Sequence, residues 1–270
     1  MLARGKDRVY SPGMTNRLIS LAFSHYNEKA RWALDICGIP YVEEKYMPGF
    51  SSLAVMRATA FRGGSDDRVS TKYSTPLLLL SDGTKLHDSA DICRYASEKG
   101  GNDLYPSPEV EELERYFHDR VGPNTRRVAY GFAFEDPQIL ARMADDNVSA
   151  RQARWFKRLY PLVVRRLRGG LGLDPERIEK SQGHVRAEFD ALAERLGERE
   201  FLCGGTFTAA DLTWASMVVP AILVTREEGF GASMPTLDEI PEEAVQMVGE
   251  LRTHPAGQFA LRMYREHRRI

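Results

Sequence analysis

Short apolar runs and a helical period alternate in the N-terminal part of the chain. Residues 17–23 are an apolar run that is too short for a helix and long enough for a buried strand. From Tyr26 to Cys37 the apolar residues recur at helical spacing, with charged residues largely on the other side, and Gly38 is a typical end for a helix. Residues 39–46 return to a strand pattern. The sequence therefore predicts a strand, a helix and a second strand, which together have the length of a parallel βαβ unit.

A hairpin and another helix follow this unit. Residues 76–86 contain two apolar stretches joined by an Asp-Gly pair at 82–83, and such a pair supplies the positive φ angles of a tight turn. Asp88 or Ser89 then provides the N-cap of a helix that extends through Glu98. The predicted N-terminal domain is thus βαβ followed by ββα.

Strand patterns nearly vanish in the C-terminal part of the chain. Val185, Phe189, Leu192 and Leu196 recur at spacings of four, three and four, as on the apolar face of a helix. A proline-containing stretch at 104–108 separates the two patterns, so we expect a domain boundary there. The expected organisation is a loose N-terminal arm over 1–15, an α/β domain over 16–100, a linker over 101–108 and an all-helical domain over 109–270.

Composition and charge fit an ordinary globular protein with two domains. The chain has 270 residues, of which 43% are hydrophobic and 28% charged, so it can bury a sizeable core. The formal net charge is −1, which argues against attraction of the whole molecule to nucleic acid or anionic lipid. Seven basic residues lie between Arg151 and Arg168, and we interpret them as a solvated helix face.

Cysteines and apolar runs bear on the cellular compartment. Cys37, Cys93 and Cys203 are widely spaced and odd in number, so they predict neither a disulfide framework nor a metal site. The N-terminus lacks the apolar stretch of a signal peptide, and no apolar run has the length of a membrane span. We therefore expect a cytoplasmic protein with no membrane or nucleic-acid partner.

Four local motifs, in their order and spacing, resemble the cytosolic glutathione S-transferase family. They are a helix start at 24–34, the pair Thr75-Pro76, an acidic-Ser pair within 86–92 and a helix cap within 201–212. The resemblance implies an α/β thioredoxin-like N-terminal domain (βαβ–ββα) that binds glutathione, followed by an all-α helical-bundle C-terminal domain. It also implies a homodimer, with glutathione as co-substrate and no metal.

The resemblance places Ser24 opposite the sulfur of glutathione. A thiol with a pKa of about 8.5 is a poor nucleophile until it ionises. The helix start offers free N–H groups and the positive end of a dipole, and the Ser24 hydroxyl can donate a hydrogen bond to the sulfur. The alternatives are that Ser24 only caps the helix, and that Tyr26 is the sulfur donor. Because Asn27 stands where a redox relative would carry a second cysteine, we do not expect disulfide exchange.

The resemblance also implies that Thr75, Pro76, Asp88 and Ser89 bind glutathione. A cis Thr75–Pro76 bond would let the Thr75 backbone pair with an extended peptide. Asp88 and Ser89 start a helix and would hold the γ-glutamyl end. The family usually has glutamate or glutamine in place of Asp88, and its connection corresponding to residues 60–73 is shorter and less polar. These departures keep open a second hypothesis, a non-catalytic binding or assembly module.

We expect the second substrate to bind between the two domains, where such pockets commonly form. Aromatic and basic side chains of the first helical segment provide candidate contacts for a small hydrophobic or anionic electrophile, namely Tyr116, Arg120, Arg126, Arg127 and Tyr130. Trp155 and Phe156 are further candidates for the pocket wall. The leading hypothesis is attack of the glutathione thiolate on this electrophile. A glutathione-dependent isomerase or dehalogenase would use the same activated sulfur, and the sequence does not separate these activities.

Overall fold

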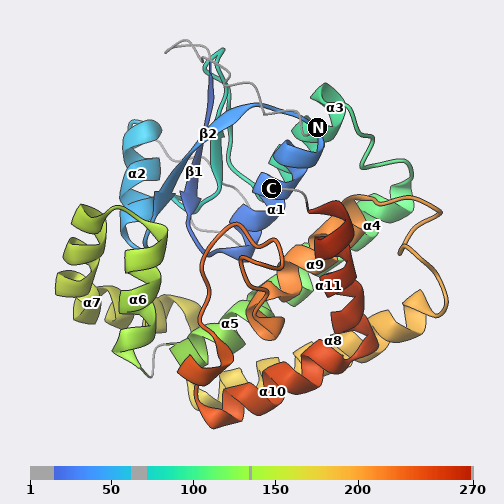
Figure 1. Ribbon diagram of the computed structural model, residues 1–270. Helices are drawn as coiled ribbons and strands as arrows, with labels where there is room; N and C mark the ends of the chain where they lie inside the picture. Colours follow the sequence, from blue (N-terminus) through green and yellow to red (C-terminus); the bar gives the residue numbers. More distant parts are fainter. Residues whose placement is uncertain (1–14, 62–71, 134–135, 269–270) are drawn as a thin grey trace, which may run out of the picture.

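The computed structural model describes residues 15–61, 72–133 and 136–268 (Figure 1). The expected N-terminal arm lies almost wholly outside these residues, and so does most of the polar segment 60–73. The N-terminal part contains, in chain order, β1 (Asn16–Leu21), α1 (His25–Ile36), β2 (Tyr41–Tyr46), α2 (Phe50–Ala58), β3 (Leu77–Leu79), β4 (Lys85–Leu86) and α3 (Ser89–Lys99). The predicted βαβ–ββα order is confirmed, and α2 is an additional helix between its two halves.

The four strands form one mixed sheet in the order β2-β1-β3-β4. β1 and β2 are parallel, with Leu18 opposite Glu43, whereas β3 is antiparallel to both β1 and β4. The predicted Asp-Gly turn joins the last two strands, and Gly83 has a φ of 90°, which a residue with a side chain rarely adopts. The short antiparallel pair ends directly before α3, which begins at Ser89.

Helix α1 is buried on its polar side as well as its apolar side. Every residue from His25 to Leu34 is buried, because α1 lies between the sheet domain and the helical domain (Figure 1). The charged residues therefore pair inside the protein. Lys29 Nζ lies 2.6 Å from Glu114 Oε1, and the Glu28 carboxylate receives bonds from Arg31 and Arg268. The N-terminal domain is thus fixed to both ends of the helical domain.

The C-terminal part is helical. Residues 100–107 connect α3 to α4. The elements are α4 (Pro108–Tyr116), a π-helical turn (Phe117–Val121), α5 (Gly122–Ala133), α6 (Pro137–Asn147), α7 (Ala150–Leu171), α8 (Pro175–Leu196), α9 (Ala209–Ile222), a 3₁₀ turn (Leu237–Glu239), α10 (Glu242–Thr253) and α11 (Pro255–His267). The expected helical bundle is confirmed.

Helix α9 is the centre of this bundle and is buried along its whole length. Thr208 and Asp211 form the capping box expected from the sequence, and Asp211 also accepts a hydrogen bond from the backbone of Leu202. Trp214 of α9 packs against Phe117 and Phe189 of neighbouring elements. This apolar core continues into the N-terminal domain without interruption.

Candidate functional site

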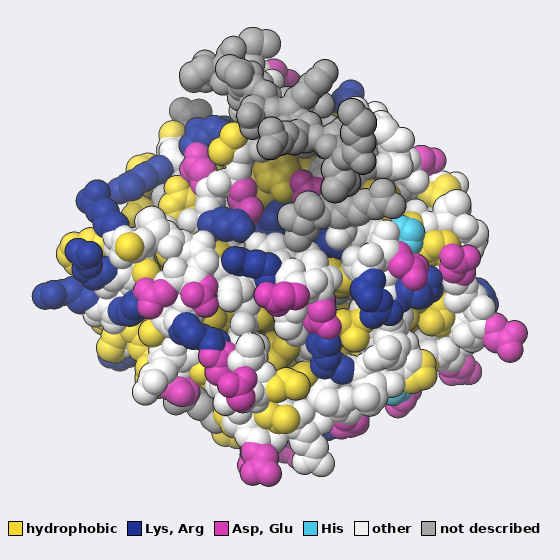
Figure 2. Space-filling view, viewed as in Figure 1, with side chains coloured by type: hydrophobic (Ala, Val, Ile, Leu, Met, Phe, Trp, Pro, Cys, Tyr) yellow, Lys and Arg dark blue, Asp and Glu magenta, His cyan; other side chains and the backbone are white. Residues whose placement is uncertain are grey.

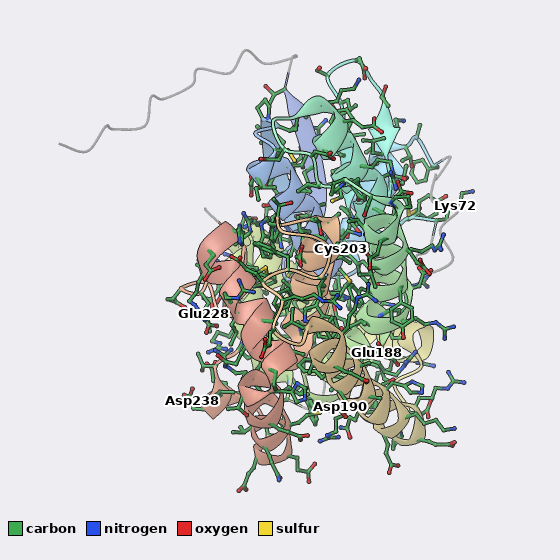
Figure 3. The ribbon with its side chains drawn as sticks, turned by 90° about the vertical axis from the view of Figure 1, so that its right-hand side faces the viewer. Lys72, Glu188, Asp190, Cys203, Glu228 and Asp238 are labelled. Atoms are coloured by element: carbon green, nitrogen blue, oxygen red, sulfur yellow. The ribbon has the colours of Figure 1, made fainter. Side chains whose placement is uncertain are left out.

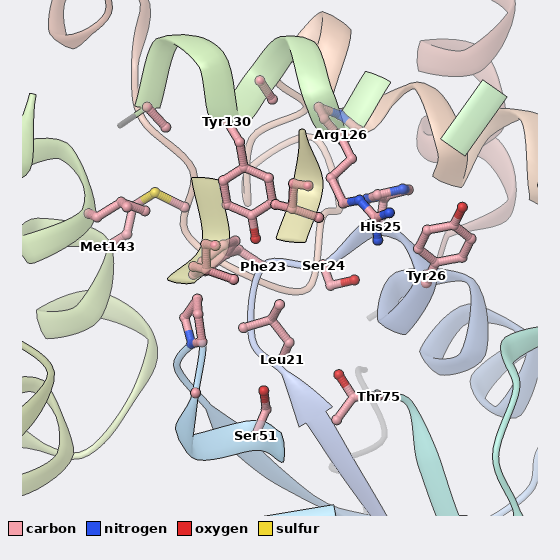
Figure 4. A pocket seen from close by; sticks show the side chains of 18 of the residues that line it. Leu21, Phe23, Ser24, His25, Tyr26, Ser51, Thr75, Arg126, Tyr130 and Met143 are labelled. Carbon is pink, nitrogen blue, oxygen red and sulfur yellow. The ribbon is translucent and has the colours of Figure 1, made fainter. Parts of the chain in front are cut away.

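A cavity of about 920 Å³ lies where the two domains meet (Figure 4). Its N-terminal wall comes from the turn after β1, the start of α1, α2 and the loop before β3. Its helical wall comes from α5, α6, α7 and the segment 220–248. Most of the lining is apolar, and the polar residues that line it from the N-terminal domain are Ser24, His25, Tyr26, Ser51, Ser52, Lys72, Tyr73, Ser74, Thr75, His87 and Asp88.

Ser24 lies at the end of the β1–α1 turn, directly before α1, and faces this cavity (Figure 4). Its N–H donates to the Leu21 carbonyl at 3.0 Å, which closes the turn, and its carbonyl accepts from Glu28 at 2.9 Å to begin the helix. Ser24 is the N-cap residue of α1 by position, but its side chain makes no capping hydrogen bond. The hydroxyl is therefore not used for capping, the alternative role that the sequence left open.

Tyr26, the second candidate, is held differently. Its hydroxyl donates to the His118 carbonyl at 3.0 Å, and its ring packs between His25 and His118 with centroid distances of 4.3 and 4.8 Å. The side chain thus connects α1 to the π-helical turn of the other domain. This bonding favours Ser24 as the group that faces a ligand.

The Thr75–Pro76 peptide bond is cis, as predicted, and both residues line the cavity. Asn27 fixes their position relative to the β1–α1 turn. Its Nδ2 donates to Thr75 Oγ1 at 3.3 Å, and its Oδ1 accepts from the Leu21 N–H at 3.3 Å. Asn27 therefore joins the end of β1 and the loop before β3, which both lie next to Ser24 in the cavity wall. The sequence did not suggest this role.

Asp88 and Ser89 begin α3, as expected. Asp88 accepts the Ala90 N–H at 2.6 Å, lines the cavity, and lies 3.7 Å from His118 Nε2. Ser89 is fully buried directly beside it, and its Oγ has no hydrogen-bond partner among the described residues. Unlike Asp88, Ser89 does not itself line the cavity. A buried hydroxyl without a partner is costly, so a polar ligand bound at Asp88 would stabilise it.

Two further buried polar atoms in the same region lack partners in the described part of the chain. They are Ser74 Oγ and His87 Nδ1, and both residues line the cavity. Burial, with a smaller effect of the Lys85 charge, lowers the pKa of His87, which favours the neutral ring. Sequence reasoning missed both residues because neither forms a motif. Together with Ser89, they place three unsatisfied polar atoms around the loop before β3 and the start of α3.

Two basic side chains, Arg126 and His25, determine the charge near Ser24 (Figure 4). Arg126 lines the cavity near Ser24, its guanidinium lies 5.8 Å from the Tyr26 ring centroid, and it forms no ion pair with a carboxylate of the described residues. His25 Nε2 lies 3.1 Å from the Gly122 carbonyl. Burial and the Arg126 charge hold the pKa of His25 well below its usual range, so this ring is neutral at neutral pH. The positive charge near Ser24 therefore belongs to Arg126.

The expected second-substrate residues are only partly brought together. Tyr130 lines the cavity with Arg126, four residues earlier on α5, and burial raises its pKa to about 12, so it remains a hydrogen-bond donor. Arg127 is rotated by about 100° on the helix and instead donates to Leu171 and Ser181. The Tyr116 hydroxyl donates to Glu188 of α8 at 2.8 Å. Glu188 is labelled in Figure 3. Arg120 is exposed and is not part of the cavity lining.

The other candidates for the wall lie nearby without lining the cavity. Phe156 is fully buried in the core, and Trp155 is half exposed on α7. Residues that the sequence did not select complete the apolar wall, among them Phe23, Leu140, Met143, Pro220 and Met247. These five residues come from four separate segments, the β1–α1 turn, α6, α9 and α10, so only the folded chain assembles them.

The cysteines play no part in this site. All three are buried as free thiols, and none lines the cavity. Burial raises the pKa of Cys37 and of Cys203 to about 11 and that of Cys93 to about 12, so the thiols stay protonated. In the described ranges, no cluster of His, Cys, Asp or Glu could hold a metal ion, and no helix is long and apolar enough to cross a membrane.

Two family models match the sequence. The glutathione S-transferase N-terminal domain matches residues 23–99, and the glutathione S-transferase C-terminal domain matches residues 175–252. No curated protein matches the sequence. The first match covers Ser24, the Thr75–Pro76 pair and the start of α3, which are the N-terminal elements of the site described above.

Solved structures share the fold over nearly the whole chain. A glutathione S-transferase of Ceriporiopsis subvermispora in complex with glutathione is 18% identical, with a TM-score of 0.59 over 95% of this chain and 98% of that chain. A glutathione transferase of Phanerochaete chrysosporium is 15% identical, with a TM-score of 0.60 and the same coverage. A possible glutathione S-transferase from Rhodopseudomonas palustris is 16% identical, with a TM-score of 0.58 over 94% and 97%. At these identities the likeness concerns the fold.

Proposed function

Because the chain belongs to the glutathione S-transferase family, we propose that it binds glutathione with the sulfur beside Ser24 and transfers the thiolate to a small electrophile in the interdomain cavity. The observation that carries the proposal is the Ser24 side chain. It stands at the N-terminus of α1, faces the cavity and is not used as a cap. A hydroxyl and a helix N-terminus directed at one point both favour an anion there.

The rest of glutathione would extend from Ser24 toward α3. The Thr75 backbone would offer strand-like pairing to the peptide, and Asp88, which lines the cavity, would receive the α-amine. The Ser89 hydroxyl, unsatisfied at the start of α3, would donate to the α-carboxylate, which the helix dipole also favours. Ser74 and His87 are further groups within the same region that a polar ligand would satisfy.

The second substrate would lie on the helical side of Ser24. The apolar wall suits a hydrophobic electrophile, and Arg126 and Tyr130 supply a cation and a hydroxyl donor on one face of α5. An electrophile that develops negative charge during addition or displacement would be stabilised by these two groups. Arg126 would also favour the glutathione thiolate, since it lies close to Ser24 (Figure 4).

One set of measurements tests this function. The purified chain should be retained on immobilised glutathione and should catalyse the conjugation of glutathione to a general aromatic electrophile. Retention without turnover would instead favour the non-catalytic binding or assembly module, for which the engagement of Asp88 as a helix cap is an argument. Release of halide or isomerisation of a substrate, with glutathione regenerated, would identify the dehalogenase or isomerase activity.

We also propose that the protein is a homodimer, as the family resemblance implies. Sedimentation equilibrium should give a mass of twice the 30.5 kDa of one chain. A mass of one chain across micromolar concentrations would contradict this.

A further inference from the structure

Helix α7 carries an apolar stripe that is exposed at the surface, and the proposed function does not account for this exposure. Trp155, Leu159 and Leu162 are 50%, 36% and 68% exposed. Their spacings of four and three residues place them on one side of the helix. The opposite side is packed into the protein through Ala153, Phe156 and Val164. A large aromatic side chain and two leucines in a line on the surface of a helix indicate a site that binds another molecule or a membrane.

The remaining exposed surface of α7 is basic. Its 22 residues include no aspartate or glutamate, and they include Arg151, Arg154, Lys157, Arg158, Arg165, Arg166 and Arg168. Lys157 pairs with Asp145, but five of the arginines (151, 154, 158, 165 and 166) form no ion pair with a carboxylate in the described ranges. Figure 2 shows dark blue and yellow side chains next to one another along the left-hand edge, where Figure 1 places α7. The net charge of −1 for the whole chain therefore conceals a strongly cationic helix.

This surface borders the mouth of the cavity. Leu159 and Leu162 line the cavity from α7, and Leu53, which is 40% exposed, lines it from α2. The start of α7 is held to the N-terminal domain, because Gln152 accepts from the Met47 N–H, between β2 and α2, at 2.7 Å and donates to the Lys45 carbonyl of β2 at 3.3 Å. A partner that covered the apolar stripe would thus also lie against the entrance to the cavity.

We propose that α7 docks the protein on the surface of a lipid bilayer that contains anionic lipids. Tryptophan and leucine on one side of a helix, flanked by arginine and lysine and without acidic residues, form the pattern of a helix that lies in the membrane interface. The apolar stripe would enter the boundary between headgroups and acyl chains, and the flanking cations would contact anionic headgroups. The docking does not depend on glutathione transfer, and it is an alternative to the interpretation of the basic residues as a merely solvated face.

Other partners fit this surface less well. Single-stranded RNA would contact the arginines and could stack on Trp155, but Leu159 and Leu162 offer no stacking surface for its bases. A second copy bound through the same face would bring the cationic helices of the two copies together, because a two-fold interface places like patches opposite each other. An anionic bilayer can bury the leucines and pair with the cations at the same time.

The tryptophan content of the chain provides the assay. Trp32 and Trp214 are fully buried, so Trp155 is the exposed one of the three tryptophans and reports on its own environment. On addition of vesicles of phosphatidylcholine with phosphatidylserine, the emission should shift to the blue, the protein should sediment with the vesicles, and added salt should weaken both effects. Vesicles of phosphatidylcholine alone should bind at least about tenfold more weakly.

Variants of the intact chain separate the two parts of the surface. Trp155→Ser should reduce cosedimentation with the mixed vesicles about tenfold, and Arg158→Glu with Arg165→Glu should reduce it by more than that. The matched control is Arg199→Glu with Arg265→Glu, which changes the net charge equally at two exposed arginines outside α7 and should leave binding unchanged. All of these side chains are exposed, so unchanged thermal melting should confirm folding.

Three results would overturn the proposal. One is the absence of sedimentation and of any emission shift with the mixed vesicles at low salt. Another is an equal loss of binding in the α7 charge variant and its control, which would indicate a general effect of charge. The third is protection of Trp155 by RNA, or by self-association, in the absence of vesicles. That result would assign the face to a different partner.

Discussion

The amide of Asn27 donates a hydrogen bond to Thr75 Oγ1 at 3.3 Å and so joins the start of α1 to the loop before β3. The same side chain accepts from the Leu21 N–H at the end of β1. Ser24 lies between Leu21 and Asn27 in the sequence, within the turn that the second bond closes. Thr75 is the residue whose backbone would pair with glutathione. Asn27 is therefore a positioning residue for the proposed site, although it does not line the cavity.

We predict that Asn27→Ala raises the KM for glutathione several-fold and lowers the free energy of unfolding by about 1–3 kcal/mol, because the Leu21 N–H loses its partner. Thr75→Val removes only the hydroxyl and keeps the backbone. In a double-mutant cycle on the KM for glutathione, the two substitutions should be coupled by about 0.5–1.5 kcal/mol. Additive effects would show that the hydrogen bond does not position the site.

A second prediction concerns Ser89. The free protein should be no less stable with Ser89→Ala, since the buried Oγ has no partner among the described residues. Glutathione should bind about 10-fold to 100-fold more weakly, because a hydrogen bond to a carboxylate contributes about 1.5–3 kcal/mol. Calorimetric titration with glutathione measures the affinity, and thermal melting measures the stability.

Thr213→Val is the matched control for Ser89→Ala. Thr213 is also fully buried, and its Oγ1 also lacks a partner in the described part of the chain. Neither residue lines the cavity, but Ser89 directly follows the lining residue Asp88, whereas Thr213 lies on α9. The control should affect stability similarly and leave glutathione affinity unchanged. Equal affinities of Ser89→Ala and the parent protein would remove Ser89 from the proposed site.

The sequence predicted those features that local chemistry determines. The Asp-Gly turn, the cap at Asp88 and the capping box of Thr208 and Asp211 all depend on residues a few positions apart, and all are present. Ser24 and the cis Thr75–Pro76 bond were identified from motifs. These features lie in one domain or in one helix start, where short-range interactions dominate.

Features that depend on packing between distant segments were not predictable in this way. The π-helical turn at 117–121 interrupts the α-helical period, so a constant spacing does not show which face of α5 meets the cavity. Arg126 and Tyr130 face the cavity, whereas Tyr116, Arg120 and Arg127 do not. Similarly, Lys29 lies on the polar side of α1, and only the position of Glu114 explains how it can be buried.

The buried Lys29–Glu114 pair leads to a third prediction. The atoms Nζ and Oε1 are 2.6 Å apart, both side chains are almost fully buried, and the Tyr105 hydroxyl also donates to Glu114 at 2.9 Å. Lys29→Met alone should lower the free energy of unfolding by about 3–5 kcal/mol, since it leaves an uncompensated buried carboxylate. The double variant with Glu114→Leu should recover most of this loss. A double variant that is no more stable than the single one would contradict this account.

The same pair predicts how stability depends on pH. Burial, the largest single effect, would raise the pKa of Glu114, but the Lys29 charge and the hydrogen bonds from Lys29 and Tyr105 together outweigh it and lower the pKa below its ordinary 4.5. For Glu28, burial is also the largest single effect, and the charges of Arg268 and Arg31 together with their hydrogen bonds outweigh it and lower the pKa. A carboxyl whose pKa is lowered by folding stabilises the protein fully above its unfolded pKa, and this stability is lost as the pH falls through the folded pKa. The melting temperature should therefore fall steeply below about pH 4.5. In the Lys29→Met, Glu114→Leu variant it should fall less steeply over the same pH range.

The last prediction concerns the Ser24 hydroxyl and the ionisation of glutathione. A hydrogen bond to a charged group contributes about 1.5–3 kcal/mol, which corresponds to a thiol pKa lower by roughly one to two units. Ser24→Ala should therefore raise the apparent pKa in the kcat profile by about one unit or more, and the rate should fall much more at pH 6.5 than at pH 9. The free energy of unfolding should change by less than about 0.5 kcal/mol, because the side chain does not cap α1.

Tyr26→Phe is the control that separates the two candidate donors. Its hydroxyl donates to the His118 carbonyl, so the variant should lose about 0.5–1.5 kcal/mol of stability and keep the parent's apparent pKa. Most of the rate acceleration must come from positioning, since lowering a thiol pKa also lowers its nucleophilicity, with a Brønsted slope of about 0.5. An equal loss of rate at both pH values in Ser24→Ala, with the apparent pKa unmoved, would show that the helix N-terminus or Arg126, and not Ser24, stabilises the thiolate. An apparent pKa that rises in Tyr26→Phe and not in Ser24→Ala would show that the Tyr26 hydroxyl stabilises the thiolate.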